Sequence, residues 1–187
     1  MSRTLPGVAP RIVVVDSNNR FLRWADRREV HAHQLPHRSI QVLLFNAAGD
    51  LLIQRRHRDK LTLPGYWDVS CAGHVEEPDY TAGPDDDLDA VYEAVARREL
   101  EEELGVRVDV TRLGRFGPEP GVHYEQTHLF RARHEGPFTC QPDEVEEVRF
   151  VAPAAFDAMV SEGREKLGPS LVWFVGWTRA HLRLFAR

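Results

Sequence analysis

The stretch Arg97-Arg98-Glu99-Leu100-Glu101-Glu102-Glu103-Leu104-Gly105-Val106 places four carboxylates within five residues, beside two arginines. In a helix each residue is rotated by about 100° from the last, so positions i, i+3 and i+4 share one face. Glu99, Glu102 and Glu103 stand at these positions, whereas Glu101 points nearly the opposite way. The stretch therefore predicts a helix on which three carboxylates converge.

The same helix face is apolar one to three turns earlier, at Leu88, Val91, Tyr92 and Val95. This pattern indicates that the face turns inward. Two like charges about 6 Å apart repel by roughly 3 kcal/mol at an effective dielectric constant near 20, so a half-buried trio is costly without a cation. The pattern favours a site for Mg²⁺ or Mn²⁺, which prefer oxygen ligands. The alternative is a solvated helix end whose charges face water.

The run from Arg98 to Val106 fits every fixed position in the second half of the Nudix box, Arg-Glu-U-x-Glu-Glu-x-Gly-U with U aliphatic. The chain therefore resembles the Nudix hydrolase superfamily. The family pattern opens with a Gly, for which Gly73 is the candidate. Gly73 lies 98 − 73 = 25 residues before Arg98, about eleven more than in the family pattern. The segment from Glu76 to Asp87 is rich in Pro, Gly and Asp, which predicts an inserted loop.

One position departs from the family pattern. Counting eight residues back from Arg98 leads to Ala90, where the family keeps a Glu that supports the box arginine and the metal site. Asp89 and Glu93 are the substitutes nearby, and the alternative is a weaker metal site. The missing Glu also leaves open a catalytically inactive protein that senses a nucleotide ligand.

The resemblance implies an α/β Nudix fold, in which a mixed β-sheet is sandwiched between helices (α-β-α). A chain of 187 residues with 42% hydrophobic content is long enough for one domain with its own core, so we expect a single Nudix domain over 1–187. The pattern of apolar residues predicts the following elements: a hairpin at about 11–24, strands at 40–45, 51–56, 106–113 and 123–131, an acidic turn and strand over 141–151, and helices at about 86–104, 154–162 and 170–185.

Composition limits the partners. A net charge of −5 argues against long nucleic acid, although it permits a nucleotide. Cys71 and Cys140 provide no disulfide framework. The chain shows neither the apolar run of a signal peptide nor about 20 consecutive apolar residues for a membrane span, so we expect a cytoplasmic protein. The C-terminal helix carries Trp173, Phe174 and Trp177 and is expected to pack on the domain or on a sister subunit, which makes a homodimer one of two arrangements.

Basic residues follow the second predicted hairpin. Arg55 and Arg56 end its second strand and precede the Pro64-Gly65 turn, a combination that again resembles Nudix proteins. Guanidinium groups bind phosphates through paired hydrogen bonds, so we expect Arg55 and Arg56 to hold the distal phosphate of a substrate. The alternative for both is surface solubility. For Trp67, which follows the turn, we expect packing in the core.

Two further glutamates are candidates for the chemistry. Glu125 lies on a predicted strand from which Nudix sites are often completed, and it is expected to be a metal ligand or the base that deprotonates water. Glu144, in the acidic turn before the last strand, is the second candidate for the base. Each has an exposed surface carboxylate as its alternative.

His31, His33 and His37 form a cluster in the sequence. We interpret them as partly exposed surface or entrance-loop histidines, with a metal site as the alternative.

Within the superfamily the chain resembles the isopentenyl-diphosphate isomerase-like branch, on the evidence of His37 and of the run Trp67 to His74. That isomerase has a His-rich metal site and places a Cys directly before its Gly-His pair. Here Ala72 stands in that place and Cys71 lies one residue away, which reverses the direction of a strand side chain. On the later strand Glu125 matches one of two expected carboxylates, and His123 stands at the other.

The sequence thus favours a metal-dependent hydrolase that cleaves a diphosphate linkage in a nucleoside-diphosphate-type small molecule. Mg²⁺, or Mn²⁺, is expected at Glu99, Glu102 and Glu103. Arg98 is expected to position these carboxylates, and Gly73 to let the loop backbone approach the metal and the substrate. The isomerase and the inactive sensor are the alternatives, and the sequence does not name the substrate.

Overall fold

Strand β3, His37–Phe45, is buried along its whole length and forms the centre of the fold in this computed structural model, which describes residues 10–186. It pairs in parallel with β8, Glu125–Arg133, and antiparallel with β6, Cys71–His74. The register places His37 opposite Glu125, and Ser39 opposite His74. Polar side chains from three strands that are far apart in the sequence therefore meet at the start of β3.

The other strands extend this nine-stranded mixed sheet, in which β2, β1, β3, β4 and β5 follow one another, β7 pairs with β8, and β9 pairs with β4. Their bounds are β1 Ile12–Val15, β2 Phe21–Ala25, β4 Leu51–Arg56, β5 Trp67–Asp68, β7 Thr111–Phe116 and β9 Val145–Val151. The helices are α1 Arg27–Ala32, the 3₁₀ helix η1 Glu77–Asp79, α2 Leu88–Leu104, α3 Pro153–Glu162 and α4 Pro169–Leu182.

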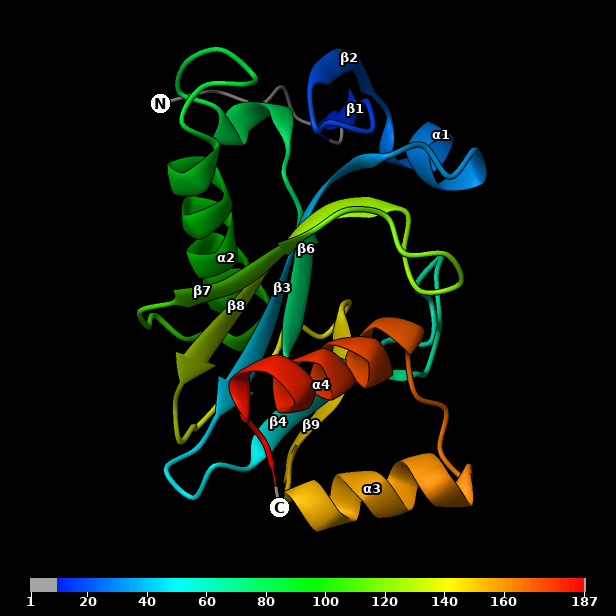
Figure 1. Ribbon diagram of the computed structural model, residues 1–187, viewed down its shortest axis with the longest axis vertical. Helices are drawn as coiled ribbons and strands as arrows, with labels where there is room; N and C mark the ends of the chain where they lie inside the picture. Colours follow the sequence, from blue (N-terminus) through cyan, green and yellow to red (C-terminus); the bar gives the residue numbers. More distant parts are fainter. Residues whose placement is uncertain (1–9, 187) are drawn as a thin grey trace.

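Alternation along β3 separates two cores. Ile40, Val42 and Leu44 pack with the apolar face of α2, whereas Leu43 and Phe45 belong to a second core with residues of α3 and α4. Helix α2 and helix α4 accordingly lie on different sides of the central strands in Figure 1. The expected α/β arrangement of a mixed sheet between helices is confirmed.

Most predicted elements are present with shifted ends. The strand expected over 106–113 is wrong in its first half: Val106 and Val110 are buried against α2, and pairing with β8 begins only at Thr111. Helix α1 was not predicted from the sequence. The terminal helix begins at Pro169 and ends before Arg183, which adopts a left-handed conformation with φ of 54°.

The inserted segment is tied down by one buried arginine. Arg38 has no exposed surface, and its guanidinium donates hydrogen bonds to groups on the first hairpin and on the insert: Asn19 O and Oδ1, Tyr80 Oη, Pro84 O and Asp85 Oδ1. A buried guanidinium is tolerated only when its donors are satisfied. Arg38 therefore fixes the insert against the sheet, next to η1.

Helix α4 packs on the second core. Leu171, Phe174, Val175 and Thr178 are buried, and Trp173 and Trp177 pack around them. This is the first of the two arrangements expected for the helix, and the homodimer stays a prediction. Within residues 10–186, no helix combines the length and the apolar character needed to cross a membrane.

Candidate active site

Two neighbouring cavities open at the end of the sheet where β3 begins. The first, the acidic cavity, has a volume of about 440 Å³ and is lined by Glu76, Arg98, Glu99, Glu102, Gln141 and Glu144. The second, the histidine cavity, has a volume of about 400 Å³, and its lining includes His31, Ser39, Gln41, His123, Tyr124 and Glu125. Five residues line both cavities: Arg27, Ala72, Gly73, His74 and Glu103. The two cavities thus form a continuous candidate site.

The three predicted helix carboxylates all line the acidic cavity, with different exposure. The side chain of Glu99 is 13% exposed and Glu103 is 7% exposed, whereas the side chain of Glu102 is 57% exposed. Burial, with the charges of Glu103 and Glu102, raises the pKa of Glu99 to about 8 although Arg98 opposes it. Burial likewise raises the pKa of Glu103 to about 7, against the hydrogen bond that Gln54 donates. Such carboxylates gain most from a nearby cation.

Arg98 joins these carboxylates to the inserted segment. Its Nη1 lies 3.0 Å from Glu99 Oε1 and 2.9 Å from Glu102 Oε2, and its Nε donates to Asp79 Oδ1 at 3.1 Å. A second nitrogen donates to Asp79 Oδ2 at 3.2 Å and to the His74 carbonyl at 3.3 Å. The arginine therefore has the positioning contacts that the Nudix resemblance implies.

Asp79, and not Ala90, stands at the position of the first glutamate of the Nudix box. The insert separates the two halves of the box, so counting back from Arg98 reaches the wrong residue, whereas counting six forward from Gly73 reaches Asp79. The proposed substitutes lie elsewhere: Asp89 pairs with two arginines of β7, and Glu93 pairs with Arg97. The carboxylate that supports the box arginine is present as an Asp, and the sequence argument for an inactive sensor disappears.

Gly73 is needed because Glu99 fills the space beside it. A Cβ on Gly73 would overlap the Glu99 carboxyl group, which has little room to move in its buried position. Gly73 pairs with Ile40 in the sheet, so the backbone cannot shift easily. Any larger residue would displace a carboxylate of the acidic cavity.

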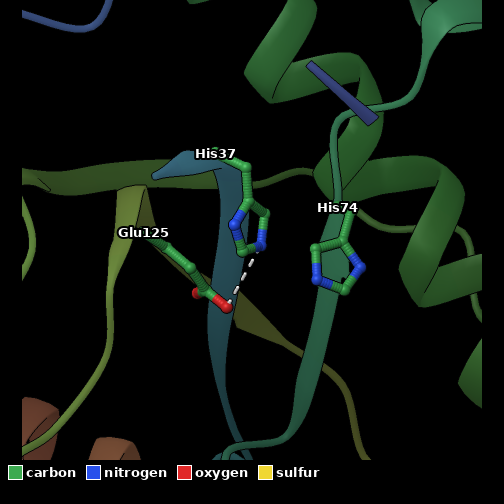
Figure 2. A group of neighbouring side chains, drawn as sticks. All are labelled: His37, His74 and Glu125. Carbon is green, nitrogen blue, oxygen red and sulfur yellow. Dashed lines mark ion pairs between the residues drawn. The ribbon is translucent and has the colours of Figure 1, made fainter. Parts of the chain in front are cut away.

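A second group of metal-ligand type borders the cavities: His74 lines both, Glu125 lines the histidine cavity, and His37 is fully buried. Ligand atoms of His37, His74 and Glu125 all lie within 4.8 Å of one another, the one such group among residues 10–186. Figure 2 shows the His37 ring between the Glu125 carboxylate and the His74 ring, each from a different strand. His37 Nε2 lies 3.5 Å from Glu125 Oε1. The three helix glutamates do not form so compact a group.

The hydrogen bonds of His37 leave one nitrogen free to bind a cation. Its Nδ1 donates to the Leu35 carbonyl at 2.8 Å, and its buried Nε2 has no hydrogen-bond partner among the described residues. Burial lowers the pKa of His74 well below its ordinary value, which keeps that ring neutral. Burial alone would raise the pKa of Glu125, but His37 and the Ser39 hydroxyl hold it far below its usual range. Two imidazoles and a carboxylate fit a divalent cation.

The surface interpretation of the histidine cluster is wrong for His37 alone. His37 is fully buried, and His31 is half-buried, with its Nδ1 hydrogen bonded to Tyr124 Oη at 2.7 Å. Only His33 is exposed. The parallel pairing of β3 with β8 brings His37 to Glu125, and this long-range register was not visible in the sequence.

The two predicted phosphate-binding arginines point to opposite sides of β4. Arg56 lines the histidine cavity, where it donates to the Thr62 carbonyl and lies 3.4 Å from Asp68. Arg55 lines neither of the two cavities and pairs with Glu146 and Glu147 on the other side. The structure therefore separates a pair that was expected to act together, because adjacent strand residues face opposite ways.

Two cations that sequence reasoning did not single out as site residues also face the cavities. Lys60 lines the histidine cavity and forms an ion pair with Glu144 of the acidic cavity. Arg27, the first residue of α1, lines both cavities, and its side chain makes no hydrogen bond or ion pair within residues 10–186. Its place on a short helix that was not predicted explains why sequence reasoning missed it.

Cys71 and Ala72 are adjacent residues of strand β6, and their side chains face opposite sides of the sheet as expected. Cys71 is fully buried in the core beneath α2, whereas Ala72 lines both cavities. Burial raises the pKa of the Cys71 thiol well above its ordinary value, which leaves it a poor nucleophile and acid. Trp67 is buried as expected.

A family model for the NUDIX domain matches residues 35–174, which include both halves of the box and every strand around the site. The chain belongs to the Nudix family. An uncharacterised Nudix hydrolase of Pseudomonas aeruginosa is 40% identical over 149 residues, covering 78% of this chain and 80% of that protein. An isopentenyl-diphosphate Delta-isomerase of Dictyostelium discoideum is 27% identical over 186 residues, covering 87% of this Nudix chain and 75% of that protein.

Solved structures share the fold. The crystal structure of DR0079 from Deinococcus radiodurans superposes with a TM-score of 0.69 at 22% identity, covering 84% of this chain and 93% of the other. The NUDIX domain of Shewanella oneidensis NrtR, solved in complex with ADP ribose, gives a TM-score of 0.56 at 15% identity, covering 84% and 99%. At these identities the likeness concerns the fold alone.

Proposed function

We propose that this Nudix protein is a metal-dependent hydrolase that cleaves a diphosphate linkage in a nucleoside-diphosphate-type small molecule. The observation that carries the proposal is the arrangement of Glu99, Glu102 and Glu103 around one cavity that continues into a second of about 400 Å³. The acidic cavity suits cations and the phosphates they bind, and the histidine cavity has room for the group attached to them.

Glu99, Glu102 and Glu103 would hold Mg²⁺ or Mn²⁺, and the carboxylate preference of these ions supports that assignment. His37, His74 and Glu125 would hold a further divalent cation, and two imidazoles favour a transition metal such as Mn²⁺ over Mg²⁺ there. Cations bound in these places supply charge neutralisation at the phosphates and a water of lowered pKa.

The protein's own cations would hold the substrate. Arg56 and Lys60 face the histidine cavity. Arg27 lines both cavities, and its guanidinium has no partner among residues 10–186. Guanidinium groups bind phosphate oxygens in pairs, which orients the diphosphate relative to the helix carboxylates. Arg98 would keep Glu99 and Glu102 in place through its ion pairs.

Glu144 is the better candidate for the general base. It lines the acidic cavity, and its ion pair with Lys60 would hold it there. The strongly lowered pKa of Glu125 favours ionised ligand over proton acceptor, because a weak base gains little from taking the proton of water. Of the two residues proposed for this role, Glu125 therefore fits the metal group and Glu144 fits the base.

A panel of substrates tests the proposal. Nucleoside diphosphates, dinucleotides, nucleotide sugars, ADP-ribose and isoprenoid diphosphates are incubated with Mg²⁺ or Mn²⁺, and separately with EDTA. Release of phosphate or of a monophosphate product that depends on the metal supports hydrolysis. ADP-ribose belongs in the panel because the Shewanella NrtR domain was solved with it. Binding without turnover under all metal conditions would reject hydrolysis.

The second candidate function is isomerisation of isopentenyl diphosphate. The His37, His74 and Glu125 group favours it, because it resembles the His-rich metal site of that isomerase, and the Dictyostelium isomerase is among the relatives. Against it stands Ala72, which leaves the cavity without the expected cysteine while Cys71 faces the core. Double-bond migration without cleavage in the same panel would favour the isomerase.

A further inference from the structure

Two buried polar side chains of the histidine cavity have unused hydrogen-bonding atoms. Gln41 is 7% exposed and His123 is 9% exposed, and both line the cavity. Within residues 10–186, neither Gln41 Oε1 nor His123 Nε2 has a hydrogen-bond partner. Buried polar atoms in native proteins are nearly always satisfied, so two exceptions in one cavity point to a ligand that satisfies them.

The backbone holds Gln41 rigidly. It lies in the middle of β3 and pairs with Ala72 on one side and with Leu129 on the other. Its side chain shares the strand face of Ser39, which also lines the cavity. Among the described residues the Gln41 amide forms no hydrogen bond to the protein. It is therefore a preformed polar group on a fixed strand.

His123 is held by stacking and by one hydrogen bond. Its ring lies nearly parallel to that of Phe174 on α4, with centroids 5.7 Å apart and 17° between the planes. Its Nδ1 accepts the Glu125 backbone N–H at 3.4 Å. A ring that accepts at Nδ1 carries its proton on Nε2, so the unsatisfied atom is a donor.

His123 does not belong to the metal-ligand group. Its ligand atoms fall outside the compact set of His37, His74 and Glu125, and its ring is turned toward α4. His123 stands where the isomerase has a carboxylate, and its Nε2 donor has no partner among residues 10–186. The cavity offers Gln41 as an acceptor and His123 as a donor.

We propose that Gln41 and His123 select substrates whose diphosphate carries a hydroxyl-rich group, ribosyl or glycosyl, in the histidine cavity. Sugar hydroxyls both donate and accept, so they can satisfy His123 Nε2 and Gln41 Oε1 together, whereas a prenyl chain would leave both unpaired. A site built for hydrogen bonding rejects an analogue without the polar groups far more strongly than an apolar site rejects an added hydroxyl. The inference rests on the proposed hydrolase function and names its substrate class.

The test compares ADP-ribose with geranyl diphosphate. The ratio of their kcat/KM values is measured for the wild type, for Gln41→Leu and for His123→Phe. We expect each substitution to lower the ratio at least about thirtyfold in favour of geranyl diphosphate. Gln126→Leu and His181→Phe are the matched controls, because they change the same residue types outside both cavities, and they should leave the ratio unchanged. If Gln41→Leu does not fold, Gln41→Asn replaces it. Its shorter side chain moves the amide away from the ligand, so we expect it to lower the kcat/KM ratio too.

Calorimetric binding of ADP-ribose in EDTA separates this inference from the proposed hydrolysis. We expect ADP-ribose binding to weaken at least tenfold in Gln41→Leu and in His123→Phe. If this happens but the wild type cleaves no substrate, the hydrolase function is rejected, whereas the proposed role of Gln41 and His123 in substrate binding stands. Equal ratios and equal binding in all variants would overturn the recognition. So would a loss of Mn²⁺ affinity in His123→Phe, because that result would make His123 a metal ligand.

Discussion

Asp79 and Arg98 form a bidentate ion pair, with Arg98 Nε 3.1 Å from Asp79 Oδ1 and a second guanidinium nitrogen 3.2 Å from Asp79 Oδ2. Asp79 lies in η1, at the start of the insert, and Arg98 lies on α2, so the pair connects the two halves of the Nudix box across the inserted residues. Through Arg98 this contact reaches Glu99 and Glu102.

Loss of the Asp79 carboxylate charge should therefore reduce catalysis, although Glu99, Glu102 and Glu103 remain in the acidic cavity. We expect Asp79→Asn to lower kcat about 10- to 100-fold, because Arg98 loses the partner that orients it. Asp79→Glu, which restores the family residue, should retain most activity. Asp89→Asn is the control on a carboxylate outside the cavities. Equal kcat values for Asp79→Asn and the wild type would show that the pair has no positioning role.

The raised pKa values of Glu99 and Glu103, about 8 and about 7, predict how stability depends on pH. Between the unfolded value near 4.5 and these folded values, the folded state binds more protons than the unfolded state. Stability of the metal-free protein therefore falls as pH rises through this window, and the full loss is present above pH 8. This contribution is absent below about pH 4.5.

Removing either charge should stabilise the metal-free protein. In EDTA at pH 9 we expect Glu99→Gln and Glu103→Gln to raise Tm by roughly 3 °C or more, with no gain at pH 4. Glu101→Gln, on the opposite face of α2, is the control. The measurement is the Tm of each variant and of the wild type at pH 9 and at pH 4. A lower Tm for both variants at pH 9 would show that the charges of Glu99 and Glu103 do not destabilise the metal-free protein.

The His37, His74 and Glu125 group predicts a measurable metal site. Because two of its ligands are imidazoles, His74→Gln should weaken Mn²⁺ binding about 10- to 100-fold by calorimetry, whereas His33→Gln on the exposed surface should not. Binding should also weaken once the pH is low enough to protonate the imidazoles, since a protonated imidazole cannot bind a cation. Unchanged affinity in His74→Gln would remove this group from the metal sites.

Arg38 predicts a large effect on folding. Arg38→Met removes all the hydrogen bonds that this arginine donates to the first hairpin and the insert, and it leaves the carbonyls of Asn19 and Pro84 without that buried donor. We expect a loss of about 3 to 5 kcal/mol in unfolding free energy, measured by urea denaturation. Arg20→Met, on the exposed hairpin turn, should change it by less than about 0.5 kcal/mol. Similar losses of unfolding free energy in both variants would show that Arg38 does not fix the insert against the sheet.

Helical periodicity was enough to predict that Glu99, Glu102 and Glu103 line one cavity, because their spacing places them on one side of the helix. Only Glu99 and Glu103 turn inward, whereas the side chain of Glu102 is exposed. Alternation along β6 likewise predicted that Cys71 and Ala72 face opposite ways. The same rule, applied to β4, would have separated Arg55 from Arg56.

What local patterns could not predict depends on contacts between distant segments. His37 meets Glu125 through the parallel register of β3 and β8, and His74 joins them from β6. Asp79 was overlooked for a different reason: the count back from Arg98 assumed that the insert lay before the first carboxylate, whereas it lies after. Arg27 sits on a helix of six residues, too short to show periodicity.

The central claim is that the carboxylates of α2 act on a diphosphate through bound cations, and Glu102 tests it most directly. Its side chain is 57% exposed, so Glu102→Gln should change the charge at the acidic cavity while leaving the fold intact. With a substrate found active in Mg²⁺, we predict that kcat/KM falls at least about a hundredfold in Glu102→Gln and stays within about twofold in Glu101→Gln. Undiminished kcat/KM in Glu102→Gln would contradict the account.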